Sequence, residues 1–139
     1  MLYTVKTDGK KYAYDSASGA VIPLNNLKFK MLNAIVPPIS QASLTSLRYE
    51  LAKFDSGEVS EAFDEILSLA QNGILYAAED GPVRLMTSGE YACESETLAS
   101  ALLTAAFEGK DTVIFETVGE GDFSKVAKTV ADTTGAKLS

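Results

Sequence analysis

Residues 1–35 decide the fold of this chain, and they read MLYTVKTDGKKYAYDSASGAVIPLNNLKFKMLNAI. Asp8-Gly9 stands between two runs of strand-forming residues. This pair is preferred in a two-residue type I′ hairpin turn, because both positions need a positive φ angle. Ser18-Gly19 marks a second turn. The pattern predicts three antiparallel strands, at about residues 2–7, 11–16 and 20–24.

The third predicted strand belongs at the edge of this small sheet. A simple meander places it there, and Pro23 has no N–H to donate to a neighbouring strand. An edge strand leaves main-chain N–H and C=O groups unpaired, so it can accept a peptide from another molecule as an added strand. This edge is the part of the sequence that points most clearly to a function.

Apolar periodicity predicts three helices after the sheet. The first begins after a cap at Asn25 or Asn26 and ends at Pro37-Pro38, because proline breaks a helix. The second and third cover about residues 43–54 and 58–72. The third has the clearest helical period in the chain, with apolar residues at Val59, Ala62, Phe63, Ile66, Leu67 and Ala70.

A domain boundary is predicted at Glu79-Asp80-Gly81-Pro82, after a short strand at residues 74–77. Beyond it the spacing predicts a strand at 83–87, a helix at 96–107, a strand at 112–118 and a helix at 123–132. This order is typical of a βαβ unit with parallel strands. We therefore predict an α+β fold. A winged-helix-like domain with a three-stranded antiparallel sheet and three helices occupies residues 1–79. A small acidic βαβα segment occupies residues 80–139, and it needs the first domain or a partner to complete a core.

Two stretches resemble one protein family. Residues 11–24, KYAYDSASGAVIPL, resemble the second and third strands of PqqD-like peptide-binding domains, and residues 63–76, FDEILSLAQNGILY, resemble their third helix and its exit. These domains are the recognition elements of pathways that make ribosomal, post-translationally modified peptides. In that family, the leader segment of a precursor peptide adds beside the third strand and lies against the third helix. The resemblance covers residues 1–79.

The resemblance implies a set of peptide-binding residues in this chain. They are Ala20, Val21, Ile22 and Leu24 at the strand edge, Phe63, Ile66 and Leu67 on the third helix, and Lys28. The alternative is that the apolar members only form the core, as periodic apolar positions usually do. The first 30 residues also hold five lysines, which either steer an acidic peptide or are ordinary solvated side chains.

Catalysis by this chain is not expected. It has no histidine, which excludes Ser/His/Asp and Cys/His mechanisms, and with one cysteine, Cys93, a zinc site is not expected. PqqD-like domains often precede radical S-adenosylmethionine (SAM) peptide maturases. Their [4Fe–4S] cluster needs the three thiolates of a CxxxCxxC motif, so this chain alone cannot bind one. Residues 113–123, with Gly119-Glu120, are weakly similar to the second strand of such a barrel, and a generic βαβα segment explains them equally.

The resemblance therefore implies a non-catalytic protein without a cofactor. It would bind a precursor (leader) peptide and deliver it to a separate maturase, a radical SAM enzyme, in a hetero-oligomer. An alternative is a degenerate accessory subunit that completes or stabilises a partner enzyme without binding peptide itself.

Charge and hydropathy argue against nucleic-acid and membrane partners. The net charge is −7, and the predicted helix at residues 58–72 carries four acidic side chains and no Lys or Arg. Phosphates would repel that helix, which makes a DNA-binding winged helix a poor alternative. No run approaches the roughly 18 apolar residues of a membrane span, and no signal-peptide pattern is visible. With a single cysteine, a cytoplasmic location is expected.

Overall fold

The computed structural model describes residues 1–37, 39–79 and 81–139. The predicted stop at Pro37-Pro38 and the predicted boundary at residues 79–82 each include one residue, Pro38 or Asp80, that lies outside this set. The described residues form a three-stranded antiparallel sheet, two short parallel strand pairs and five helices, which is an α+β arrangement. None of these helices is long and apolar enough to cross a membrane.

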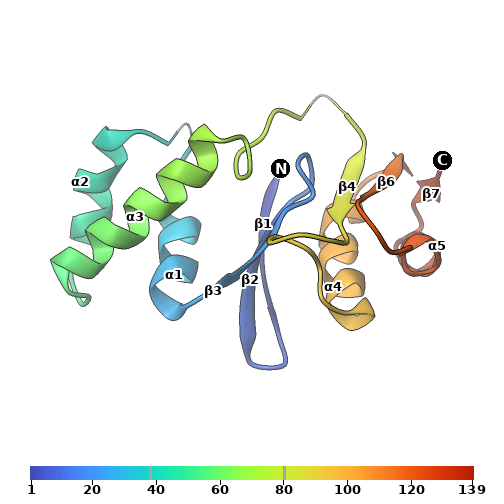
Figure 1. Cartoon of the computed structure of the whole chain (residues 1–139), viewed down its shortest axis with the longest axis horizontal. Coiled ribbons are helices and arrows are strands. Elements are labelled where there is room, and N and C mark those ends of the chain that lie inside the picture. Colours follow the sequence, from blue (N-terminus) through green and yellow to red (C-terminus); the bar gives the residue numbers. More distant parts are fainter. Residues whose placement is uncertain (38, 80) are drawn as a thin grey trace.

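The elements follow one another in an order that separates the two halves of the chain (Figure 1). The first half contains β1 (Leu2–Thr7), β2 (Lys10–Asp15), β3 (Val21–Leu24), α1 (Asn26–Ala34), α2 (Gln41–Glu50) and α3 (Ser56–Gln71). The second half contains β4 (Val83–Met86), α4 (Glu96–Phe107), β5 (Thr112–Val113), β6 (Phe115–Val118), α5 (Ser124–Thr134) and β7 (Lys137–Leu138).

The three-stranded sheet has the order β1-β2-β3, so β3 lies at its edge, as predicted. Asp8 and Gly9 have φ angles of 51° and 75°, the positive values that the predicted hairpin turn requires. On β2, Tyr14 lies opposite Tyr3 of β1 and Val21 of β3, which fixes the register of the whole sheet.

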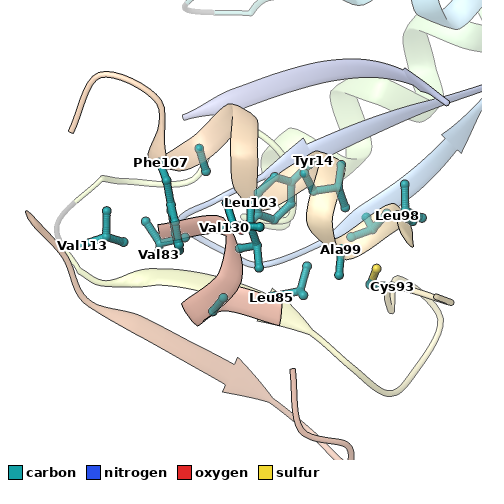
Figure 2. Close-up of a cluster of buried hydrophobic side chains, with 14 of the residues drawn as sticks. Tyr14, Val83, Leu85, Cys93, Leu98, Ala99, Leu103, Phe107, Val113 and Val130 are labelled. Atoms are coloured by element: carbon teal, nitrogen blue, oxygen red, sulfur yellow. The ribbon is translucent and has the colours of Figure 1, made fainter. Parts of the chain in front are cut away.

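The two faces of this sheet belong to two hydrophobic cores. Side chains alternate between the faces of a strand, so Ala13 and Ile22 join the core made with α1, α2 and α3. Tyr12, Tyr14 and Val21 join the core made with the second half of the chain. Figure 1 shows the helices α1–α3 on one side of the sheet and α4 on the other, and Figure 2 shows Tyr14 among side chains of the second core. The second half thus packs on the sheet of the first.

One strand of the second half differs from the sequence prediction. The strand predicted at residues 112–118 is divided at Ile114, whose carbonyl accepts a hydrogen bond from the Val83 N–H at 2.8 Å. β5 pairs in parallel with β7, and β6 pairs in parallel with β4. The division arises because the two ends of one predicted strand hydrogen-bond to different partners.

The prediction of a strand at residues 74–77 is wrong, because this segment bends after α3 and forms no strand. Its backbone groups bond to side chains of the β2–β3 turn instead of to a strand. The Ser18 hydroxyl donates to the Ile74 carbonyl at 2.7 Å, and the Ala77 N–H donates to Asp15 at 3.0 Å. The second helix also starts earlier than predicted, at Gln41, because Ser40 caps it there.

The turn between β2 and β3, residues 15–20, joins the two halves. Asp15 is fully buried, and its carboxylate accepts the N–H groups of Ala17, Ser18 and Ala77 at 2.9–3.1 Å. On the outer side of the turn, the N–H groups of β4 donate to backbone carbonyls of the turn: Arg84 to Ser16 and Met86 to Gly19, both at 2.8 Å. The Tyr14 hydroxyl also donates to the Arg84 carbonyl.

Candidate functional site

A groove of about 580 Å³ lies between the sheet edge and the third helix. Its lining comes from four places: β3 (Ile22, Leu24), α1 (Lys28, Leu32), α3 and its exit (Asp64, Glu65, Ile66, Ser68, Leu69, Asn72, Ile74, Leu75) and the β4–α4 loop (Glu90, Tyr91). Its volume is in the range of ligand-binding pockets, and most of these lining side chains are apolar.

Local capping positions the helices that wall the groove. The Asn25 side chain accepts the N–H of Lys28 at 2.8 Å, so α1 starts directly after β3, as predicted. The Asp55 side chain accepts the N–H of Glu58 at 3.1 Å and starts α3. Gly73, with a φ angle of 73°, turns the chain after α3, and Ile74 and Leu75 then line the groove.

The outer edge of β3 presents hydrogen-bond acceptors and almost no donors. The Val21 N–H donates to the Tyr91 carbonyl at 2.8 Å, so it points away from β2. In an antiparallel pair the direction alternates, so Pro23 also faces outward, and proline has no N–H. The outward carbonyls of Val21 and Pro23 accept no hydrogen bond from the residues that the structure describes. A strand added here would therefore donate more hydrogen bonds than it accepts.

The rim of the groove carries one positive and three negative side chains. Lys28 forms an ion pair with Glu65. Asp64 and Glu90 are exposed, and neither forms an ion pair within the described part of the chain. The rim thus keeps two negative charges without an ion pair in the described residues, one on α3 and one on the β4–α4 loop.

The structure brings four of the predicted site residues together and separates the others. Ile22, Leu24, Lys28 and Ile66 line the groove. The remaining four do not: Ala20 and Phe63 are fully buried, Val21 belongs to the core shared with the second half, and Leu67 lines a different hollow beside Tyr76. Their role in peptide binding stays a prediction.

Some groove residues were missed by the sequence reasoning. Leu69 follows Ile66 by three positions on the same helix, so helical spacing alone indicated it. Ser68 and Asp64 are polar neighbours on the same helix and gave no apolar signal. Glu90 and Tyr91 come from the second half of the chain, and no local pattern connects them to β3 or α3.

Cys93 lies buried in the β4–α4 loop, with its Sγ 3.3 Å from the Ser95 carbonyl oxygen. Burial raises the pKa of its thiol, which disfavours the reactive thiolate.

A search against protein-family models and a search of curated proteins found no match to this chain.

Proposed function

We propose that this chain is a non-catalytic peptide-binding protein that holds a segment of another polypeptide in the groove between β3 and α3. The observation that carries the proposal is the position of the groove. It lies beside the third strand and against the third helix, and Ile22, Leu24, Lys28 and Ile66 line it. The resemblance to PqqD-like domains leads to the same two elements by a separate route, through the sequence.

The order of elements supports a finer description of residues 1–79. Three antiparallel strands followed by three helices are the order expected for the winged-helix-like recognition domain that we propose. By the resemblance, the bound segment is the leader of a ribosomally made precursor peptide. The chain would then deliver that leader to a separate maturase, a radical SAM enzyme, in a hetero-oligomer.

Binding would combine main-chain and side-chain contacts. An extended peptide beside β3 would donate an N–H group to the outward carbonyl of the exposed Pro23, and its alternate side chains would enter the groove beside Ile22 and Leu24. The main-chain contribution is limited, because Tyr91 already accepts the Val21 N–H. Side-chain contacts with the groove therefore carry most of the selectivity.

The test is a titration of the full chain with a labelled leader peptide encoded by a neighbouring precursor gene, followed by backbone amide NMR. The proposal expects the largest shift changes in residues 21–25, 64–75 and 90–91, which surround the groove. Shifts confined to another surface would contradict the site. No binding, together with co-purification of the chain with a larger enzyme, would favour the accessory-subunit alternative.

A further inference from the structure

We propose that the occupant of the groove is a cationic peptide segment, in which apolar side chains on one face of an extended chain are flanked by Lys or Arg. This inference rests on the proposed function, since it specifies the peptide that the same groove binds. Two separate features lead to it: the charge of the groove rim, and the hydrogen-bonding polarity of the adjoining edge of β3.

The outward hydrogen-bonding groups of the β3 edge favour a ligand that brings hydrogen-bond donors. The outward backbone groups of β3 are the carbonyls of Val21 and Pro23, and the Val21 N–H is already used by Tyr91. An ordinary edge strand offers donors and acceptors in equal number. This edge offers acceptors, so a ligand gains most by bringing hydrogen-bond donors, which backbone N–H, Lys and Arg all supply.

The negative charge on the groove rim favours a positively charged ligand. Lys28 is the cationic side chain on the rim, and it is already paired with Glu65. Asp64 and Glu90 face solvent without an ion pair in the described residues. A basic side chain next to the apolar segment meets uncompensated carboxylates there, whereas an acidic one meets like charge, which opposes association.

The other lysines of the first half do not change this balance. Lys6 and Lys11 lie over the ring of Phe29, and Lys30 lies over the ring of Phe54. Neither these three nor the remaining lysines of the first half, Lys10 and Lys53, line the groove. The acidic peptide that the lysine-rich first 30 residues suggest is therefore not the ligand that this groove favours.

The experiment selects ligands without assuming their sequence. A display library of random twelve-residue peptides is panned on the full chain, and the selected peptides are then tested against the Ser68→Trp variant, in which a large exposed side chain occupies the groove. Peptides that lose binding to this variant are groove ligands. We expect them to share apolar residues at alternate positions with an adjacent Lys or Arg.

The outcomes separate this inference from the proposed function. Groove ligands rich in Asp or Glu, or without charge, would overturn the inference and leave the peptide-binding function standing. A library that yields no groove-dependent peptide would overturn both.

A charge-reversal pair gives the quantitative test. For a selected basic peptide, Asp64→Lys combined with Glu90→Lys should weaken binding about tenfold or more, since two exposed charge interactions are reversed. The matched control is Glu61→Lys combined with Asp132→Lys, which changes the net charge equally at exposed positions outside the groove. Equal weakening by both pairs would contradict a local role of the rim.

Discussion

The β2–β3 turn and the outer edge of β3 differ in how fully their backbone groups are hydrogen-bonded. In the turn, residues 15–20, many polar groups have hydrogen-bond partners. N–H groups of β4 donate to its backbone carbonyls, and the Asp15 carboxylate accepts three N–H groups. The Ser18 hydroxyl donates to the Ile74 carbonyl after α3. The outer edge of β3, only a few residues further on, keeps unpaired carbonyls and borders a groove.

This difference separates structural residues from candidate functional ones. Buried polar groups are normally satisfied, and the turn meets that rule closely. The outer edge of β3 has two carbonyls without a partner in the described residues, and its side chains Ile22 and Leu24 line the groove. Substitutions in the turn should therefore lower stability, and substitutions on the groove rim should lower binding while leaving stability nearly unchanged.

Gly19 should give the largest loss of stability. Its φ angle is 84°, and a Cβ at this position would lie 3.0 Å from the backbone nitrogen of Met86. Gly19→Ala combines a strained backbone with a close contact against the backbone of β4. We therefore expect the free energy of unfolding, measured with urea, to fall by about 3 kcal/mol.

Gly9→Ala is the matched control for this substitution. Gly9 has a similar φ angle of 75°, but its added Cβ meets no atom within 4 Å. Backbone strain alone should cost about 1 kcal/mol. Equal losses at the two glycines would show that the close approach of β4 to the turn does not matter for stability.

Asp15→Asn should give the next largest effect. The carboxylate accepts N–H groups with both oxygens, and the amide would turn a donor toward at least one of them. We expect a loss of about 2 kcal/mol, because a buried donor is left unsatisfied. Asp8→Asn, in the exposed hairpin turn where Asn-Gly is equally suitable, should cause no measurable change.

Two tyrosines should respond differently to loss of the hydroxyl. Tyr14 donates to the Arg84 carbonyl, so Tyr14→Phe should cost about 1 kcal/mol. The Tyr76 hydroxyl is buried without a partner in the described residues, and burial raises its pKa to about 12. Tyr76→Phe should therefore leave the free energy of unfolding unchanged or slightly higher. A clear loss for Tyr76→Phe would mean that its hydroxyl makes a stabilising bond in solution.

Local patterns in the sequence predicted much of the fold. Asp8-Gly9 indicated the first hairpin because a two-residue turn depends on neighbouring residues alone. The period of Val59, Phe63 and Ile66 likewise indicated α3 and its buried face, because helical spacing is a property of the segment itself. The placement of β3 at a sheet edge followed from chain order and Pro23.

The features that the sequence did not reveal depend on contacts between distant residues. The burial of Asp15 requires Ala77, and the division of the predicted strand at Ile114 requires Val83 and β7. The separation of Val21 from the groove residues Ile22 and Leu24 has the same cause. Val21 is apolar like Ile22, and only the position of the second half shows that the two face different cores.

The most direct test of the central claim is the affinity of the leader peptide for two tryptophan variants on the same helix. Ser68 lines the groove, whereas the exposed Gln71 lines the hollow beside Tyr76. The free energy of unfolding of both variants should lie within about 0.5 kcal/mol of that of the unmodified chain, since both positions are exposed. We predict that Ser68→Trp weakens peptide binding at least tenfold and that Gln71→Trp does not. Unchanged affinity in Ser68→Trp would contradict the groove as the binding site.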